Sequence, residues 1–265
     1  MCRDVTAAES CRREISRTAG PADTRSVFSD LFNSYICPEC LSDFFYIQKP
    51  YCRKCGKQLL GSGTPESRQK GPAGTQGLLC RDCAAKERSF RECRCLAVYD
   101  DVMQEILTNI KYRGRKEYTQ LMGLLAAWRL GPWIAAVRPD AFVPVPVHPE
   151  RKQVRGYNQA ELLAEELSQA LYYTGGSGNG KIPVRTDLLI RAKKTTAQKE
   201  LNADQRLMNL QGAFAVTGKI TGHPRLMIID DIYTTGSTLN ACSEVLLRAG
   251  AAEIYGLCMA AGTDS

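Results

Sequence analysis

The sequence has no long apolar run and little histidine. No stretch approaches the roughly 20 apolar residues that a membrane-spanning helix needs, and the N-terminus mixes both charge signs without the apolar core of a signal peptide. We therefore expect a cytoplasmic protein that does not insert into a membrane. With only His148 and His223 in 265 residues, the chain offers little support for a histidine general base.

Length and composition favour one main domain with a small module. A chain of 265 residues with 44% hydrophobic content can bury one α/β core and an appendage, but hardly two full domains. Gly-rich stretches at 61–77 and 174–180 are too poor in apolar residues to pack, so we expect loops there. We predict an irregular segment at 1–34, a cysteine-rich module at 35–95 that contains the flexible insertion 61–77, and a main domain at 96–265.

Cysteine is plentiful and unevenly placed. Ten of the twelve cysteines lie in the first 95 residues, several as C-x-x-C pairs, and this pattern favours metal thiolates over disulfides. A structural Zn²⁺ site needs four ligands, and four thiolates leave no open position for catalysis. The module would then be structural or a docking surface. In chain order, the three pairs are Cys37 and Cys40, Cys52 and Cys55, and Cys80 and Cys83.

Six paired cysteines do not divide into sites of four, and the sequence leaves the grouping open. The first and second pairs can form one zinc site, which leaves the third pair to other partners. Alternatively the second and third pairs form the site, and the first pair uses the upstream Cys2 and Cys11. The remaining four cysteines fall in apolar stretches and are expected to be packing residues or spare thiols; they are Cys93, Cys95, Cys242 and Cys258.

Residues 226–238 carry the most informative pattern. The apolar run 226–229 predicts a buried parallel strand, and the apolar spacing of 238–248 predicts a helix. The loop between them lies at a helix N-terminus, where backbone N–H groups and the helix dipole favour an anion. Asp230 and Asp231 would repel a bare phosphate, but they suit a ligand that also presents hydroxyls or a bound Mg²⁺. The loop supplies small and hydroxyl-bearing residues, namely Thr234, Thr235, Gly236, Ser237 and Thr238.

This stretch resembles the phosphoribosyl pyrophosphate (PRPP) motif of type I phosphoribosyltransferases. The resemblance implies an α/β fold with an open, mainly parallel sheet flanked by helices. It also implies that Asp230 and Asp231 hold the ribose hydroxyls, that the loop 234–238 binds the 5-phosphate, and that Mg²⁺ accompanies PRPP.

Periodicity predicts several other elements. We expect strands at 96–99 and at 142–147, the second bending into a loop because its prolines lack donors. Helices are expected around 102–110 and 121–130. A further amphipathic helix carries Leu162, Leu163, Leu167 and Leu171 along one side.

Further segments extend the resemblance to the ComF family (ComFC/GntX type). They are KYRGR at 111–115, VPVPVHPERKQVRGYNQAELLAEEL at 143–167 and LLIRAKKTTAQKELNADQRLMNLQGAFAV at 188–216. The resemblance implies an N-terminal zinc module ahead of a phosphoribosyltransferase domain, and an association with natural competence, the handling of imported single-stranded DNA. We also expect His148, at the end of the strand 142–147, and Arg155 at the PRPP site.

Basic residues are concentrated between 181 and 219. Eight Lys/Arg against three Asp/Glu give this segment +5 of the chain's +7. The resemblance places here the loop that closes over pyrophosphate, and a cationic lid suits a reaction that expels pyrophosphate. We predict Arg191, Asp230 and Asp231 as the catalytic set. A second basic cluster is equally compatible with phosphate contact and with plain surface; it comprises Lys111, Arg113, Arg115 and Lys116.

The resulting hypothesis is a ComF-type phosphoribosyltransferase that moves ribose 5-phosphate from PRPP to an unidentified acceptor. Structural Zn²⁺ and PRPP-bound Mg²⁺ are the expected cofactors, and single-stranded DNA and competence proteins are the expected partners. One alternative is a competence factor without enzymatic activity that senses PRPP or binds single-stranded DNA. A second alternative is a salvage phosphoribosyltransferase that acts on purines or pyrimidines.

Overall fold

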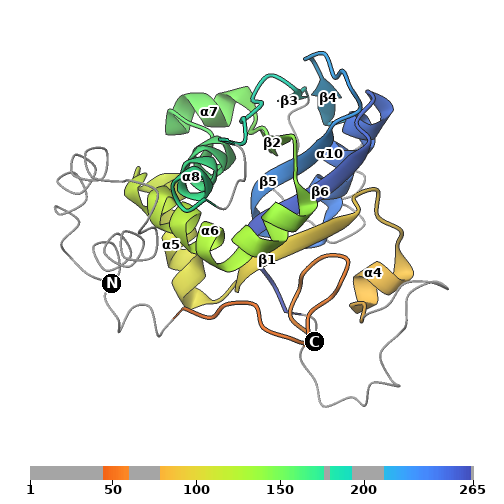
Figure 1. The fold of residues 1–265 in the computed structure, drawn as a ribbon. Coiled ribbons are helices and arrows are strands. Elements are labelled where there is room, and N and C mark those ends of the chain that lie inside the picture. Colours follow the sequence, from red (N-terminus) through yellow and green to blue (C-terminus); the bar gives the residue numbers. More distant parts are fainter. Residues whose placement is uncertain (1–43, 60–77, 176–179, 193–211, 264–265) are drawn as a thin grey trace.

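The computed structural model describes residues 44–59, 78–175, 180–192 and 212–263, and these form an α/β structure around a parallel sheet (Figure 1). Four strands lie in the order β1-β6-β5-β2, and each neighbouring pair is parallel. This confirms the predicted α/β class and the open parallel sheet. The strands are β1 (Glu92–Val98), β2 (Ala141–Pro144), β5 (Arg225–Tyr233) and β6 (Glu253–Ala261).

Helices cover both faces of the sheet. Along β5, Met227 and Ile229 are buried in one core cluster while Leu226 and Ile228 are buried in the other, as expected for a strand whose side chains alternate. The first cluster contains residues of α5 (Asp101–Tyr112), α6 (Glu117–Val137) and α8 (Gln159–Tyr173). The second contains residues of α10 (Ser237–Arg248) and three cysteines of the N-terminal region, near α4 (Arg81–Ala85).

The helices α5 and α10 begin and end close to the expected positions, whereas α6 extends well beyond the expected 121–130 at both ends. Asp100 caps α5, because its carboxylate accepts a hydrogen bond from the Met103 amide at 2.9 Å. Asn158 caps α8 in the same way. Three leucines of the predicted apolar stripe on α8 are fully buried, namely Leu163, Leu167 and Leu171. The fourth, Leu162, is only partly buried.

The segment 142–147 forms a strand and then bends, as its prolines predict. Regular pairing of β2 with β5 ends at Pro144, one last hydrogen bond runs from the Val145 amide to the Ile229 carbonyl at 2.9 Å, and α7 (Pro149–Arg155) follows. The bend directs residues 145–147 toward the carboxyl end of β5.

A small two-stranded antiparallel sheet was not anticipated. It pairs β3 (Leu189–Arg191) with β4 (Phe214–Val216), and β4 lies beside α10 (Figure 1). It brings Arg191 toward the end of the main sheet. Among the helices within the described residues, none combines the length and apolarity needed to cross a membrane.

Candidate functional site

A cleft of about 880 Å³ opens at the carboxyl ends of β2 and β5. In open parallel sheets this edge is where ligands bind. The strand β5 extends through both acids to Tyr233, four residues beyond the apolar run that predicted it. Charged and polar side chains line the cleft, among them Lys111, Arg151, Arg155, Gln159, Arg191, Asp230, Asp231, Thr234 and Thr238.

The two acids have different surroundings. Asp231 is 7% exposed, and its Oδ2 accepts hydrogen bonds from Lys111 Nζ at 2.5 Å and from Gln159 Nε2 at 3.2 Å. Asp230 faces the cleft, and its Oδ1 accepts a hydrogen bond from the backbone N–H of Asp231 at 2.9 Å. Burial raises the pKa of Asp230 to about 8, and the charge of Asp231 adds to the shift. Asp231 is therefore fixed by a cation, whereas Asp230 is suited to receive one.

Two cations face these acids from different elements. Burial lowers the pKa of Lys111, but the charge and hydrogen bond of Asp231 outweigh this effect, so the net shift is upward and the lysine keeps its proton. Burial and the charge of Arg151 lower the pKa of Arg191. Arg191 also lies 5.5 Å from the ring centroid of Phe214. The cleft thus combines an acid pair with cations that would meet the anionic parts of a ligand.

The predicted anion-binding residues form a tight turn at the start of α10, which we call the β5–α10 loop (residues 234–238). Thr235 Oγ1 lies 2.8 Å from Ser237 Oγ. Gly236 is the N-cap of α10 and has a φ of 75°, a conformation that favours glycine. A Cβ at this position would also overlap the hydroxyl of Tyr233 beneath it. Thr234 and Thr238 line the cleft, whereas Ser237 is buried.

The other predicted PRPP-binding residues lie on α7. Arg155 lines the cleft, donates to Gln159 Oε1 at 3.0 Å and lies 5.0 Å from the ring centroid of Tyr112. His148 is instead the N-cap of α7, where its Nδ1 accepts from the Glu150 amide at 3.3 Å. It is not among the described residues that line the cleft.

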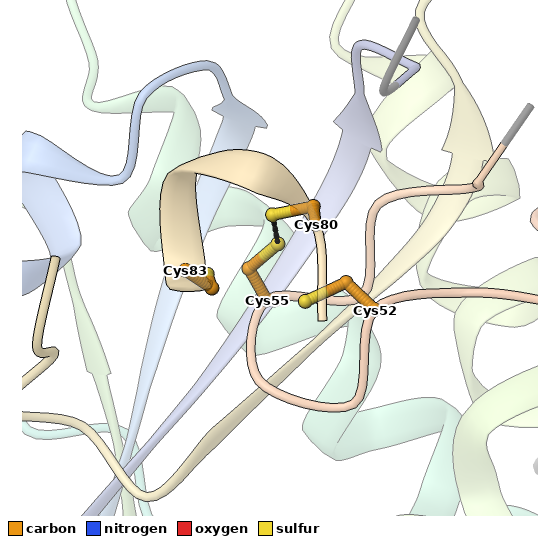
Figure 2. Close-up of side chains that lie close together, drawn as sticks. All are labelled: Cys52, Cys55, Cys80 and Cys83. Atoms are coloured by element: carbon orange, nitrogen blue, oxygen red, sulfur yellow. Dashed lines mark hydrogen bonds between the residues drawn. The ribbon is translucent and has the colours of Figure 1, made fainter. Parts of the chain in front are cut away.

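Four cysteines converge on the other side of the β5–α10 loop. Cys52 and Cys55 come from a turn that we call the knuckle (residues 52–56), and Cys80 and Cys83 come from the start of α4 (Figure 2). All four sulfur atoms lie within 4.8 Å of one another, and Cys55 Sγ and Cys80 Sγ are 3.5 Å apart. This cysteine cluster matches the second of the two groupings left open above. Cys37 and Cys40 lie outside the described residues.

The donor set fits a structural zinc ion. Tetrahedral Zn²⁺ with Zn–S distances near 2.3 Å sets the sulfurs roughly 3.8 Å apart, close to the arrangement present. Hydrogen bonds among the thiols lower the pKa of Cys52 and raise that of Cys55, so one thiolate is favoured at the expense of its neighbours. A divalent cation would remove this conflict, because it favours all four thiolates together.

The knuckle is packed directly on the sheet. The Cys93 amide of β1 donates to the Lys54 carbonyl at 2.8 Å, and a Cβ on Gly56 would lie about 3 Å from the β1 backbone at 93–95. Beneath it, three further sulfurs lie within 4.8 Å of one another, those of Cys93, Cys95 and Cys258. They are buried in the apolar core, as expected of packing residues, and so is Cys242.

The chain is similar over most of its length to bacterial proteins named for competence or DNA utilization. The chain is 29% identical to competence protein F of Haemophilus influenzae over 77% of its own length and 82% of the relative. It is 28% identical to the DNA utilization protein YhgH of Escherichia coli K12 over 84% and 89%. It is 27% identical to competence protein ComFC of Bacillus subtilis over 82% and 80%. No protein-family model matches the chain. The chain is therefore a homologue of bacterial proteins that are named for competence and DNA utilization.

Three features of the site were not predicted from the sequence. Gln159, which holds Asp231, lies in the YNQ sequence at the start of α8, and its place beside a helix cap was the available signal. Lys111 pairs with Asp231, a contact that the sequence did not indicate because its basic cluster is equally compatible with phosphate contact and with plain surface. Tyr233 falls in the segment expected to be a loop, although its ring is buried beside Phe90 and Lys57 of the cysteine-rich region.

Proposed function

We propose that this chain is a PRPP-binding protein of the ComF type with the type I phosphoribosyltransferase fold, preceded by a cysteine-rich module over residues 35–95. The observation that carries the proposal is the acid pair at the end of the central strand β5, followed by the β5–α10 loop and opening on one cleft. Ribose hydroxyls would meet Asp230 and Asp231, and the 5-phosphate would meet the loop hydroxyls and the α10 N-terminus. The cleft volume is in the range that holds a small phosphorylated ligand.

The remaining charges suit the pyrophosphate of this ligand. Arg191 and Arg151 face the cleft from β3 and α7, and the negative charge of a departing pyrophosphate would be stabilised there. Mg²⁺ bound with PRPP, in reach of Asp230, would supply charge neutralisation between the phosphates and the ribose. Lys111 and Gln159 hold Asp231 in place, so the acid is positioned before the ligand arrives. Transfer of ribose 5-phosphate to an acceptor is the reaction that these groups support.

The relatives' names connect this site to DNA. Because those proteins are called competence and DNA utilization proteins, we propose a role in the use of imported single-stranded DNA. One specific observation favours direct binding. Tyr112 is 66% exposed at the rim of the cleft, where Arg113 and Arg155 also lie, so a base could stack on the ring while the cations contact phosphates.

The decisive experiment is calorimetric titration of PRPP with Mg²⁺ into the full-length protein. We expect binding in the wild type and at least a hundredfold weaker binding, about 2.7 kcal/mol, in the Asp230→Asn/Asp231→Asn variant. Asp187→Asn is the matched control, because Asp187 is an exposed acid paired with Arg185 outside the cleft. Wild-type protein that does not bind PRPP would end the proposal.

A second titration separates the enzymatic and non-enzymatic versions. PRPP binding followed by pyrophosphate release in the presence of nucleobases or nucleotides supports transfer, whereas binding without release supports a PRPP sensor. Single-stranded oligonucleotide affinity should fall steeply with salt if the rim cations contact phosphates. A shallow salt dependence would argue against direct DNA binding.

A further inference from the structure

The cysteine cluster and the β5–α10 loop are joined by one side chain, that of Tyr233. This residue ends β5, is 2% exposed, and immediately precedes the loop. Its ring packs edge-to-face on Phe90, with centroids 6.4 Å apart and an interplanar angle of 88°. Lys57 Nζ lies 6.0 Å from the ring centroid on the cysteine side. In the sequence Lys57 lies between the two cysteine pairs and Phe90 follows the second pair, so the tyrosine is held by the cysteine-rich region.

The other end of Tyr233 supports the loop. The hydroxyl lies directly beneath Gly236, where any Cβ would overlap the hydroxyl and the ring carbon that bears it. Although this hydroxyl is buried, it has no hydrogen-bond partner among the described residues. The hydroxyl therefore contacts Gly236 by van der Waals packing. The Tyr233 side chain therefore limits how closely Gly236 can approach β5. It thereby helps to fix the direction of the backbone N–H groups at the start of α10.

A second contact runs from the same region to the first turns of α10. The Ser89 amide donates to Asn240 Oδ1 at 2.8 Å, one residue before Phe90 in the chain. The cysteine-rich region thus contacts the residue before the loop and a residue just after it. Both ends of the anion-binding turn depend on residues 89–90.

Lys57 links the two halves of the cysteine cluster. It is 8% exposed, it follows Cys55 by two residues, and its ammonium donates to Asp82 of α4 at 3.0 Å. Asp82 lies between Cys80 and Cys83. A metal ion on the four sulfurs would fix the distance between the knuckle and α4, and hence the position of Lys57 against the Tyr233 ring. Without the metal, the four sulfurs have no shared ligand that keeps the knuckle and α4 together.

From this chain of contacts we infer that metal bound at the cysteine cluster and phosphate bound at the β5–α10 loop stabilise each other through Tyr233. The inference rests on the proposed PRPP site and gives the cysteine cluster a role in ligand affinity as well as in folding. Tyr233 is a positioning residue in this account. Coupling between two binding sites is reciprocal, so PRPP must tighten zinc by the same factor that zinc tightens PRPP.

The test measures zinc affinity of the full-length protein by competition with a chromogenic chelator, with and without saturating Mg²⁺ and PRPP. In the wild type we expect PRPP to tighten zinc at least fivefold, within the usual range of coupling between sites. Tyr233→Leu should retain zinc, bind PRPP about tenfold more weakly, and lose the effect of PRPP on zinc. Tyr233→Phe keeps the ring but removes the hydroxyl beneath Gly236, so it should retain more of the coupling than Tyr233→Leu.

Tyr255→Leu is the matched control, because Tyr255 lies on β6 against Trp133 in the other core cluster. It should leave the coupling at the wild-type value. Zinc affinity that is the same with and without PRPP in a wild type that binds PRPP overturns the inference and leaves the proposed function standing. A Tyr233→Leu variant with wild-type coupling also overturns it. A wild type that does not bind PRPP overturns both.

Discussion

The cysteine cluster and the cleft, on the two sides of the β5–α10 loop, differ in how far their polar groups are already paired. On the cysteine side the side chains are buried, four sulfurs meet at one point, and a single buried lysine is paired with an acid. On the cleft side Asp230 is left to face a cavity lined by arginines from β3 and α7. A site whose ligands can all be satisfied by one ion suits a structural role. A site whose charges remain to be matched suits a ligand that comes and goes.

The largest expected effect comes from removing one sulfur of the cysteine cluster. Cys55→Ser leaves three thiolates and should abolish tight zinc binding, whose free energy in small structural sites is about 10–16 kcal/mol, comparable to the stability of a whole domain. We expect loss of zinc and of cooperative unfolding, measured by metal analysis and thermal denaturation. Cys242→Ala, at a buried thiol outside the cluster, should keep zinc and lose a smaller amount of stability. If Cys55→Ser melted like Cys242→Ala, the cluster would not be the structural side of the molecule.

A smaller effect is expected on the cleft side from Lys111→Met. The change leaves the buried Asp231 carboxylate without its cation, and removing one partner of a charged hydrogen bond costs roughly 1.5–3 kcal/mol. Denaturant unfolding should show this loss at neutral pH. Lys152→Met removes an exposed pair with Glu161 and should cost less than about 1 kcal/mol. Equal losses in the two variants would mean that the cleft acids are not held by buried charge.

The sequence predicted one side of this comparison better than the other. The run 226–229, the helix that follows and the leucines of α8 were recognised because burial on a sheet imposes local periodicity. The acid pair and the loop were found because an apolar strand, two acids and a run of hydroxyl residues, in that order, indicate a ligand-binding loop between a strand and a helix. These features depend on neighbours in the chain, which is why sequence alone located them.

Contacts across the chain were not predictable in this way. The grouping of the cysteine pairs depends on whether α4 packs against the knuckle. This is a contact between segments far apart in the chain, and no local sequence pattern indicates it. The same holds for Lys111 and Gln159, which reach Asp231 from two different helices. His148 was expected to face the ligand at a strand end. The chain bends after Pro144, and His148 becomes the N-cap of α7.

The effect expected to be smallest, taken per pH unit, is the pH dependence of ligand binding in the cleft. The folded pKa of Asp230 is about 8, above the roughly 3.9 of an unfolded aspartate. Between these values the folded protein holds a proton that the unfolded chain has lost, so stability without ligand should fall as pH rises toward 8. Mg²⁺ with PRPP must displace that proton. Affinity should therefore rise with pH, by up to about tenfold (1.4 kcal/mol) per unit below 8, and level off above it.

The control for this prediction is Asp230→Asn, which has no proton to displace. PRPP itself titrates over part of this range, and that contribution is common to both proteins. The difference between the two pH profiles, measured by calorimetry, isolates the carboxyl of Asp230. Parallel profiles would mean that this acid does not meet the cation. The cleft would then hold its ligand through Asp231 and the arginines. In that case the cleft side, like the cysteine side, would bind through groups that are already held in place without ligand.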